Sequence, residues 1–292
     1  MRAPHLASER RNLPELPEVE TVRRGLAERF VGRVIERVEV GRERVVRRTS
    51  RLALIDGLTG ATAVAAHRRG KYLLCPMDTG DVLMIHLRMS GRVLIAPTDS
   101  ERPAHTHVVM HLAGSPAEEL RFVDPRTFGE VVVFDPNNAL VEMPEVTRLG
   151  IDPIADGLSR AQLARLLRGR QRAMKAFLLD QSIIAGIGNI YADEILHASR
   201  VRYDRRSDSL TPAEVSRMHV AIGSILADAI AAGGSTLKDT QYVDIGGEGG
   251  WFQISHHVYD REGQGCVTCG KSVIKRVMFG GRSTSFCPRC QK

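Results

Sequence analysis

The chain has 292 residues, of which 43% are hydrophobic and 26% charged, so it is long enough for two domains with well-filled cores. Its formal net charge is +7 and its pI is near 9.4, which favours an anionic partner, nucleic acid before a membrane surface. The sequence contains no run of 18 apolar residues, the length needed to span a bilayer. Its first residues lack the apolar core of a secretory signal, so a cytoplasmic protein is expected.

The first predicted element is a helix over residues 17–29, which follows the stretch NLPELPEVE at residues 12–20. Pro17 suits the first helical position, and Glu18 suits the first turn because the helix dipole is positive there. One face of this helix would be apolar and would carry Val19, Val22 and Leu26.

From Val34 to about Phe134, short β-type runs are separated by Gly, Pro, Asp and Ser. This spacing is typical of a β-sandwich or a β-barrel. Cys75 lies in one of the runs and is expected to be a small buried core residue. The runs are RVIERVEV, ATAVAA, KYLLCPM, DVLMIHLRM, RVLIA, HVVMHL and EVVVF.

The β pattern breaks over residues 137–156, and helical signals follow. Ser159 with Gln162, and Thr211 with Glu214, each have the spacing of a capping box at a helix start. The region from Ser159 to residue 232 is therefore predicted to be mainly helical.

Four cysteines near the chain end predict a metal site. Cys266-x2-Cys269 and Cys287-x2-Cys290 are separated by 17 residues, which fits four thiolates on one tetrahedral Zn²⁺. Two disulfides are the alternative, disfavoured in a reducing compartment. Four protein ligands leave no open position, so the zinc would be structural. The same segment carries six cations that suit phosphate contacts or, alternatively, a solvated face: Lys271, Lys275, Arg276, Arg282, Arg289 and Lys292.

The stretch DQSIIAGIGNIYADEIL places Gly186 and Gly188 in a tight turn, with Asn189 at a helix start. Helix N-termini expose unpaired N–H groups that bind phosphate. Asn189 could instead simply cap its own helix.

Five strings occur in order along the chain: LPELPEVE, HLRMSG, DPRTFG, GIGNIYADE and GRSTSFCPRC. Together they closely resemble the formamidopyrimidine-DNA glycosylase family, bacterial enzymes that remove oxidised purines such as 8-oxoguanine from duplex DNA. The resemblance covers residues 13–292.

The resemblance implies an α+β fold with DNA lying across the cleft between two halves. An N-terminal β-sandwich with an N-terminal helix would form the catalytic domain. A helix–two-turn–helix domain and a C-terminal zinc-ribbon β-hairpin with one structural Zn²⁺ would bind the DNA. The expected boundaries are 14–136 for the sandwich, 137–158 for a linker, 159–245 for the helical domain and 246–292 for the end of a lesion-proximal loop and the ribbon.

The resemblance also implies base excision followed by β,δ-elimination at the abasic site, with Pro14 as the nucleophile. A free α-amino group has a pKa of about 7.7–8.0, against about 10.4 for lysine, so more of it is uncharged near neutral pH. Attack of Pro14 on the sugar C1′ would expel the damaged base and leave an iminium ion. That cation would acidify the C2′ proton and so permit elimination of the phosphates.

Three further residues have catalytic roles by resemblance, although each could also be an ordinary surface charge. Glu15 matches the general acid/base. Lys71 matches a proton donor that also contacts phosphate. Arg282 matches an arginine near the lesion phosphate that assists the second elimination.

A base inside a duplex must be rotated out before it can react, at a cost of a few kcal/mol. By resemblance, Met89, Arg126 and Phe128 form a wedge that fills the vacated space. The remaining DNA contacts that the resemblance implies are His105, Arg170, Asn189 and Lys238.

Three features depart from the family pattern. Arg88 stands where glycine is commoner and would add a cation beside the wedge, and Thr127 stands where some members have a second arginine. Residues 1–13 precede Pro14, and an acylated Pro14 could not form an iminium ion. We therefore expect residues 1–13 to be a processed or non-native extension, as when translation starts at Leu13 and the initiator methionine is removed.

Three other functions stay open from the sequence. The first is an endonuclease VIII-like enzyme for oxidised pyrimidines. The second is a non-catalytic binder of damaged DNA, if residues 1–13 persist. The third is a zinc-ribbon RNA binder, which would leave NLPELPEVE unexplained. The sequence shows no sign of oligomerisation, so a monomer is expected.

Overall fold

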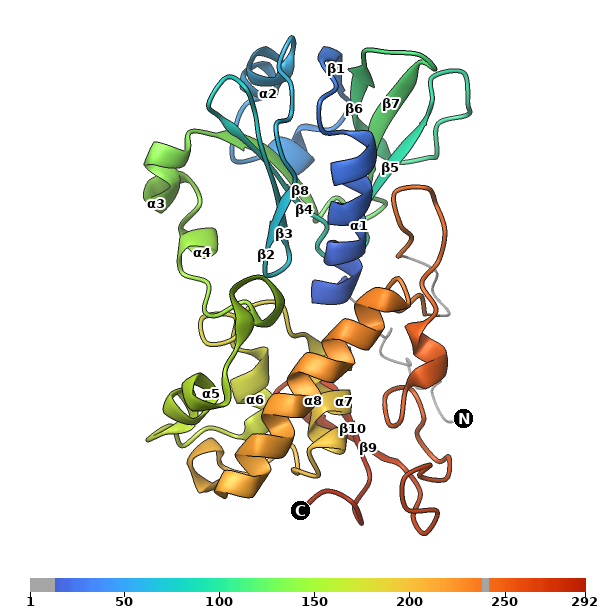
Figure 1. The fold of residues 1–292 in the computed structure, drawn as a ribbon. Coiled ribbons are helices and arrows are strands. Elements are labelled where there is room, and N and C mark those ends of the chain that lie inside the picture. Colours follow the sequence, from blue (N-terminus) through green and yellow to red (C-terminus); the bar gives the residue numbers. More distant parts are fainter. Residues whose placement is uncertain (1–13, 238–241) are drawn as a thin grey trace, which may run out of the picture.

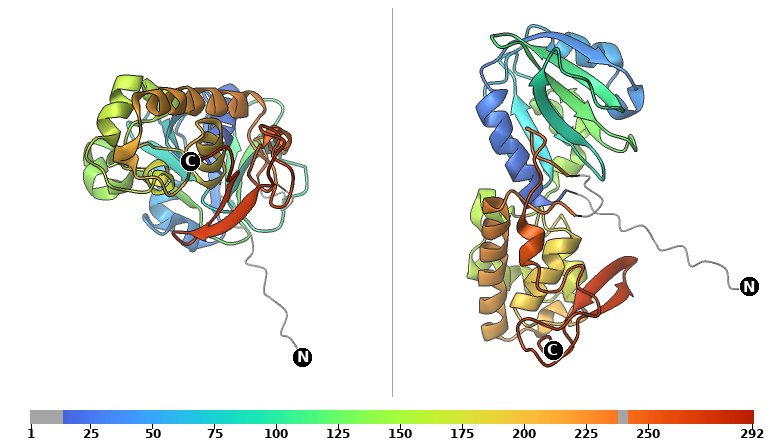
Figure 2. Two further views of the ribbon diagram at one scale, coloured as in Figure 1. Left: turned by 90° about the horizontal axis from the view of Figure 1, so that it is seen from below. Right: turned by 90° about the vertical axis from the view of Figure 1, so that its right-hand side faces the viewer.

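The computed structural model describes residues 14–237 and 242–292. The protein consists of two stacked halves, a β-sandwich and a mainly helical half, with helix α1 (Leu16–Arg29) at their junction (Figure 1). The side view in Figure 2 shows the C-terminal hairpin of β9 and β10 projecting from the helical half. Among the described residues, no helix is long and apolar enough to cross a membrane.

The sandwich is built from two antiparallel four-stranded sheets. The first has the order β1-β6-β7-β5 and comprises β1 (Ile35–Val40), β6 (Thr106–Leu112), β7 (Glu118–Val123) and β5 (Arg92–Pro97). The second has the order β2-β3-β4-β8 and comprises β2 (His67–Arg69), β3 (Tyr72–Pro76), β4 (Val82–His86) and β8 (Glu130–Phe134). The β-sandwich prediction is therefore confirmed. One core cluster draws buried side chains from both sheets.

The individual runs were predicted with mixed success. Six of them contain strands, and Cys75 is fully buried on β3, where burial raises the pKa of its thiol to about 12. The run ATAVAA is not a strand, because it makes only the isolated bridges Val34–Thr62 and Ala63–Met77. Strands β2 and β7 lay outside the predicted runs, as did helix α2 (Arg51–Leu58), which follows the 3₁₀ helix η1 (Glu43–Val46).

Helix α1 begins one residue earlier than predicted, so Pro17 occupies the second helical position rather than the first. Glu15 is the N-cap, and the Glu18 side chain accepts a hydrogen bond from its backbone N at 2.9 Å. The predicted apolar face is buried in the sandwich core, whereas Leu16 belongs to the core of the helical half. Helix α1 therefore packs its first turn against one half and the rest against the other.

The helical half follows a connection with short helical turns. The connection contains η2 (Pro136–Asn138), α3 (Ala139–Glu142), α4 (Pro144–Thr147) and the π-helical turn η3 (Pro153–Gly157). The main helices are α5 (Arg160–Leu167), α6 (Met174–Leu179), α7 (Asn189–Ala198) and α8 (Pro212–Ala231), with the 3₁₀ turn η4 (Ser207–Ser209) between α7 and α8. Both predicted capping boxes are confirmed, at the starts of α5 and α8.

The chain ends in the 3₁₀ turn η5 (Phe252–Ser255) and the hairpin of β9 (Lys275–Phe279) and β10 (Arg282–Phe286). Phe279 pairs with Arg282 across a two-residue turn. Both turn residues, Gly280 and Gly281, have positive φ, which glycine adopts without strain. The turn therefore places Arg282 at the first position of the returning strand.

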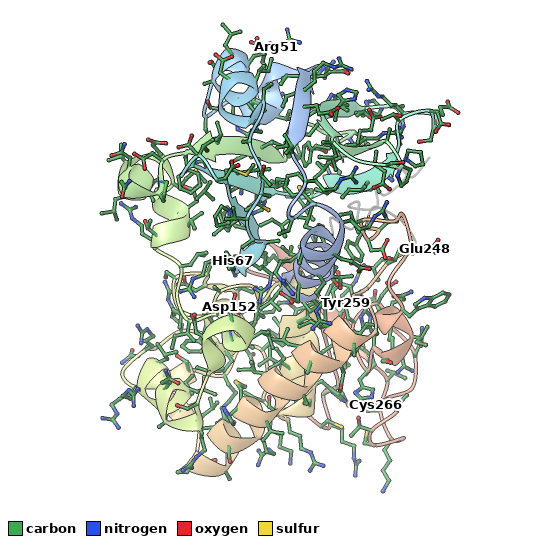
Figure 3. All side chains as sticks on the ribbon, turned by 45° about the horizontal axis from the view of Figure 1, so that its top comes forward. Arg51, His67, Asp152, Glu248, Tyr259 and Cys266 are labelled. Atoms are coloured by element: carbon green, nitrogen blue, oxygen red, sulfur yellow. The ribbon has the colours of Figure 1, made fainter. Side chains whose placement is uncertain are left out.

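A buried ion-pair network joins the two halves. The Arg68 guanidinium on β2 donates to both carboxylate oxygens of Asp152 in the connection, at 2.5 and 3.2 Å, and to Glu20 on α1 at 3.0 Å. Gly70 N also donates to Asp152 at 2.8 Å. Figure 3 shows Asp152 at the level where the halves meet. Because Arg68 and Asp152 are almost fully buried, breaking this pair would leave an uncompensated charge in the interior.

Candidate active site and nucleic-acid interface

The predicted catalytic segment is bound directly by the glycine turn before α7. Leu16 N donates to the Gly186 carbonyl oxygen at 3.1 Å. The Glu15 carboxylate accepts from Ile190 N at 2.9 Å and Tyr191 N at 3.3 Å, which are free amides at the start of α7. The helix N-terminus therefore binds an anion, but this anion is the carboxylate of the protein's own Glu15 rather than the phosphate that the sequence predicts.

Both glycines of that turn are required by close contacts with the N-terminal segment. A Cβ on Gly188 would lie 2.2 Å from Glu15 Cδ, and a Cβ on Gly186 would lie 2.6 Å from Leu16 Cδ1. Gly186 also has a φ of 96°, which favours glycine. The sequence Gly-x-Gly thus allows the start of α1 to approach α7.

Burial controls the acidity of Glu15. Loss of solvation raises its pKa from 4.5 to about 7, a shift that the charge of Lys71 opposes and that of Glu18 reinforces. A carboxyl group with this pKa exchanges its proton readily near neutral pH. Glu15 can therefore act as either a proton donor or an acceptor beside Pro14, which is itself buried.

Lys71 of the sandwich interacts electrostatically with this carboxyl group, and Arg282 of the ribbon interacts with Lys71. Lys71 occupies the two-residue turn between β2 and β3, and Arg282 begins β10. Burial lowers the pKa of Lys71, the charge of Arg282 lowers it further, and the charge of Glu15 opposes the shift. The structure thus brings Lys71 within electrostatic range of both Glu15 and Arg282.

Glu18 forms a second buried carboxyl site beneath the first. Its Oε1 accepts from Tyr191 OH at 2.5 Å and from Ser235 N at 2.7 Å, and burial raises its pKa. Ser235 precedes the segment that holds Lys238, which lies outside the described residues. Glu18 therefore links the N-terminal segment to Ser235.

Helix α7 also holds the zinc ribbon. The Asp193 carboxylate accepts from Lys175 Nζ at 2.7 Å and from Ser285 N on β10 at 2.8 Å. Lys175 Nζ and Asn189 Nδ2 both donate to the carbonyl oxygen of Ser283, at 2.9 and 3.1 Å. These contacts fix β10, and with it Arg282, relative to the GIGN turn.

Asn189 does not cap its own helix. The N-cap of α7 is Gly188, and Asn189 makes no capping hydrogen bond. Its Oδ1 is buried without a hydrogen-bond partner among the described residues, whereas its amide nitrogen bonds to the ribbon. The alternative interpretation of Asn189 as a simple cap is therefore wrong.

The four predicted metal ligands converge. Their Sγ atoms all lie within 4.8 Å of one another, with Cys266–Cys290 at 3.8 Å and Cys269–Cys287 at 3.9 Å. A Zn–S length of about 2.3 Å gives a tetrahedral S–S edge of about 3.8 Å, so the cluster has the right size. All four cysteines are free of disulfides, and the set holds one structural zinc ion.

The predicted wedge residues lie on two neighbouring turns. Met89 is on the β4–β5 turn, and Arg126 and Phe128 are on the β7–β8 turn, each half-buried. The Arg126 guanidinium lies 4.9 Å from the centre of the Phe128 ring, and that of Arg44 lies 5.9 Å from it. An aromatic ring flanked by cations is suited to contact stacked bases and phosphates.

Arg88 is a cation next to Met89 in the sequence, but it is paired. Its guanidinium donates at 3.1 Å to Glu130, a buried carboxylate that also pairs with Arg47 and Arg48 at 2.5 and 2.8 Å. Thr127 is buried and has a φ of 53°. Its side chain therefore offers little surface for a phosphate contact.

The other predicted DNA contacts, His105 and Arg170, are exposed. His105 precedes β6 and has a φ of 67°. Arg170 follows α5, and its guanidinium donates to the Leu166 carbonyl oxygen at 2.6 Å. Both side chains are accessible to a partner, but neither contacts the Glu15 site.

Sequence reasoning missed Lys175 and Asp193, which hold the ribbon, and Glu194. Burial raises the pKa of Asp193 to about 7 and lowers that of Lys175. Glu194 accepts hydrogen bonds from the three consecutive backbone amides of residues 257–259. The available signal was the run of acidic residues in NIYADE, on a helix with an otherwise apolar sequence.

Three family models match the chain in order. They describe the formamidopyrimidine-DNA glycosylase N-terminal domain at residues 13–131, the H2TH domain of the same enzymes at 149–241, and a zinc finger found in FPG and IleRS at 263–292. A formamidopyrimidine-DNA glycosylase of Desulfitobacterium hafniense is 40% identical over 279 residues, which are 96% of this chain and 100% of the relative. The chain belongs to the formamidopyrimidine-DNA glycosylase family.

Other members of the family agree with this assignment. The Nocardioides sp. formamidopyrimidine-DNA glycosylase is 42% identical over 282 residues, which are 96% of this chain and 94% of the relative. A Lactococcus lactis FPG mutant in complex with Fapy-dG containing DNA has a TM-score of 0.86 at 34% identity, covering 96% of this chain and 100% of that one. The Lactococcus lactis enzyme with DNA containing an abasic site has a TM-score of 0.85 at 34% identity, covering 95% and 99%.

Proposed function

We propose that this protein excises oxidised purines, including 8-oxoguanine and formamidopyrimidines, from duplex DNA and then cleaves the strand at the abasic site. The observation that carries the proposal is the position of Glu15. Its carboxyl group is fixed at the start of α7, has a pKa of about 7 and adjoins Pro14. Relatives of this chain have been crystallised with Fapy-dG and abasic DNA, which supports the choice of substrate.

Pro14 serves as the nucleophile in this proposal. As a chain terminus it would carry a secondary amine with a lone pair able to attack C1′ of the lesion nucleotide. The C1′–N bond breaks, the base leaves, and an iminium ion joins Pro14 to the opened sugar. Loss of the C2′ proton and then of the two phosphates completes the β,δ-elimination.

Glu15 moves the protons for these steps. With a pKa of about 7, it can protonate the opening sugar and later accept a proton near neutral pH. Lys71 donates a proton during elimination and contacts phosphate, and Arg282 assists the second elimination. Burial of Lys71 and its repulsion by Arg282 lower the lysine pKa, which makes its proton easier to transfer.

The other predicted site residues bind the duplex and open its base stack. Met89, Arg126 and Phe128 occupy the space of the extruded nucleotide, while the remaining contacts bind the DNA: His105, Arg170, Asn189 and Lys238. The domain boundaries of this proposal are 14–136, 137–158, 159–245 and 246–292. The bound zinc fixes the ribbon that carries Arg282.

The mechanism requires a free nitrogen on Pro14. The family match begins at residue 13, and the Desulfitobacterium hafniense relative is covered completely by 279 residues of this chain. We therefore assign residues 1–13 to a processed or non-native extension. A cytoplasmic monomer that acts on double-stranded DNA is consistent with this function.

Two damaged duplexes separate the proposal from its nearest alternative. The Pro14-start chain should release 8-oxoguanine at least tenfold faster than thymine glycol from otherwise identical duplexes under single-turnover conditions. The opposite order would assign the chain to oxidised pyrimidines. Tight binding to both duplexes without release of either base would identify a non-catalytic damage binder.

A further inference from the structure

The wedge is assembled from two turns that are far apart in the sequence. The β4–β5 turn carries Met89, and the β7–β8 turn carries Arg126 and Phe128. Each turn carries the chain from one sheet of the sandwich to the other, and the flanking strands are paired, β4 with β8 and β5 with β7, as far as His86–Glu130 and Arg92–Val123. This pairing brings the two turns side by side but does not extend into residues 87–91 and 124–129. The relative position of three side chains that enter one gap in DNA therefore depends on contacts between the turns themselves.

Asp124 bonds to both turns. This residue is fully buried. One oxygen of its carboxylate accepts from Ser90 Oγ in the first turn and from Arg126 N in the second, the latter at 3.1 Å. The other oxygen accepts from Gly129 N at 2.7 Å. The carboxylate therefore has donors from the turn of Met89 and from both ends of the turn of Phe128.

The backbone of Asp124 extends the same junction to a third segment. Its N–H donates to the His105 carbonyl oxygen at 3.0 Å, and its own carbonyl oxygen accepts from Thr127 N at 3.2 Å. The carbonyl oxygen also lies 3.0 Å from His107 Nε2 on β6. A single buried residue thus ties the predicted wedge to the segment that carries the predicted phosphate contact His105.

The Phe122 ring supports both turns from below. A Cβ on Gly91 would lie 3.0 Å from Phe122 Cζ, and a Cβ on Gly129 would lie 2.5 Å from the same atom. Both glycines therefore allow their turns to lie directly on this buried ring. Arg88 and Thr127, one in each turn, have a φ of 53°, a conformation that persists in side-chain-bearing residues only when surrounding contacts enforce it.

We propose that Asp124, through its hydrogen bond from Ser90, is the positioning residue that makes Met89, Arg126 and Phe128 enter DNA as one unit. The inference rests on the proposed function, since it takes these three side chains as the wedge. Asp124 itself is buried beneath the turns and is not assigned any contact with DNA. Its role is to fix the geometry of residues that do make such contacts.

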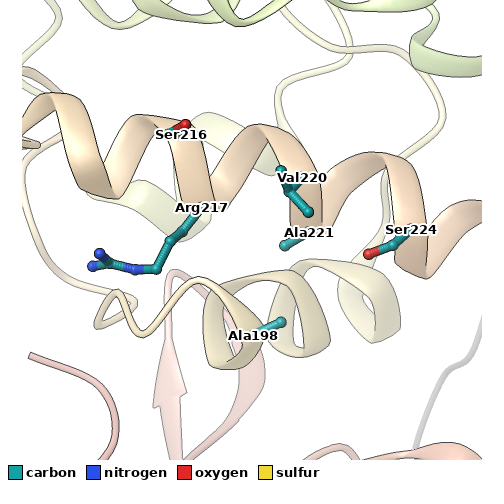
Figure 4. Close-up of a pocket in the computed structure, with 6 residues that line it drawn as sticks. All are labelled: Ala198, Ser216, Arg217, Val220, Ala221 and Ser224. Carbon is teal, nitrogen blue, oxygen red and sulfur yellow. The ribbon is translucent and has the colours of Figure 1, made fainter.

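A cavity of ≈ 320 Å³ elsewhere on the molecule takes no part in this role. It lies at the end of α7 and along α8 (Figure 4) and is lined by Ala198, Ser216, Arg217, Val220, Ala221 and Ser224. None of these residues belongs to the candidate site.

The test is a binding measurement that needs no catalysis. The full chain is mixed with a duplex that carries a tetrahydrofuran abasic analogue opposite 2-aminopurine, whose fluorescence reports entry of the wedge. Ser90→Ala should slow the fluorescence change or weaken duplex affinity about tenfold or more, because the two turns lose the hydrogen bond between Ser90 and Asp124. Affinity for the single-stranded oligonucleotide with the same analogue should stay within twofold, since no stack has to be opened.

Two further variants make the result specific. Ser50→Ala removes the hydroxyl that accepts from Ala53 N at the start of α2, in the same domain but outside the wedge, and should behave as wild type with DNA. Asp124→Asn turns one acceptor into a donor that faces an N–H or O–H group, so its loss on the duplex should exceed that of Ser90→Ala. Wild-type fluorescence kinetics in folded Ser90→Ala would overturn the proposal, as would equal losses on single and double strands. Failure of the Pro14-start chain to form a covalent adduct with abasic DNA would contradict the proposed function instead, and would leave this binding result interpretable.

Discussion

Glu15 and Glu18 are two buried carboxyl groups about one helical turn apart, and both have shifted pKa values. Burial raises the pKa of both, to about 7 for Glu15. Each accepts several hydrogen bonds, so each is held in place despite the cost of burying its charge. Burial of Glu15 costs the folded protein stability, and it gives a carboxyl group that can transfer protons near neutral pH.

Glu15→Gln should therefore change how the stability of the protein depends on pH. Because the folded protein holds the Glu15 proton up to about pH 7 and the unfolded chain releases it near 4.5, ionisation of Glu15 destabilises the fold as the pH rises between these values. A glutamine side chain cannot ionise, so for residues 1–292 the free energy of unfolding of the variant relative to wild type should increase by up to about 3 kcal/mol between pH 4.5 and 8. Urea titrations at several pH values measure this difference, and a pH-independent difference would contradict the raised pKa.

The same substitution in the Pro14-start chain should reduce base excision by about 10²–10⁴-fold, the usual contribution of a general acid/base. Glutamine keeps an oxygen that can accept from Ile190 N or Tyr191 N, so affinity for a duplex with an uncleavable abasic analogue should change little. Unimpaired excision by Glu15→Gln would remove Glu15 from the mechanism.

Gly188→Ala tests the position of Glu15 rather than its chemistry. The added Cβ would lie 2.2 Å from Glu15 Cδ and would displace the carboxyl group from the α7 amides. Excision should fall at least tenfold. The matched control is Gly223→Ala on α8, where nothing lies within 4 Å of the new Cβ and the helix should be stabilised slightly. Equal activity of the two variants would show that the close contact is not needed.

At the scale of elements, helix α7 organises the site. Its first turn binds the N-terminal segment, its next turn binds the zinc ribbon through Asp193, and Glu194 binds the amides of residues 257–259. Ten residues therefore fix three segments that lie far apart in the sequence.

The buried pair of Lys175 and Asp193 should be essential for holding the ribbon in place. Asp193→Asn would leave the Lys175 ammonium buried without its counter-charge, and breaking such a pair costs about 3–5 kcal/mol. The double variant Lys175→Met/Asp193→Asn removes that charge and should recover part of the stability. Chemical unfolding of both proteins checks this order, and a single variant as stable as the double one would contradict it.

The sequence predicts local features of the fold well and contacts between distant segments poorly. The two capping boxes, the burial of Cys75 and the convergence of four cysteines depend on short spacings, and each is confirmed. ATAVAA resembles a strand but makes only isolated bridges, because strand pairing depends on partners that composition does not reveal.

In the candidate site, too, the sequence does not predict contacts between distant residues. Glu15 and Lys71 were identified from motifs, whereas the binding of Glu15 by α7 joins residues about 175 positions apart. The pairing of Arg88 with Glu130 joins residues 42 positions apart and was not foreseen. No spacing rule connects such pairs, so only the folded structure reveals them.

At the scale of the whole molecule, the halves are joined by α1 and by the Arg68–Asp152 pair, while the ribbon depends on its metal. Arg282 lies on that ribbon, so DNA binding and catalysis should both depend on zinc.

Removal of zinc by a chelator should release one metal ion per chain and expose four thiols to titration. Affinity for damaged duplex should fall by at least tenfold, because β10 loses the support of the metal. Circular dichroism should retain the signal of the sandwich, whose core contains none of the four ligands. Metal-free protein that binds and cleaves duplex normally would contradict a structural role for the ion.

The central claim is that the Pro14 nitrogen bonds to the lesion sugar, and borohydride trapping tests it most directly. Chains that start at Met1 and at Pro14 are each mixed with an abasic duplex and reductant, and the adduct is mapped by peptide mass spectrometry. We predict that the Pro14-start chain becomes cross-linked through Pro14 and that the longer chain, with residues 1–13 retained, does not. An adduct on any other residue, or none from the Pro14-start chain, would contradict the account.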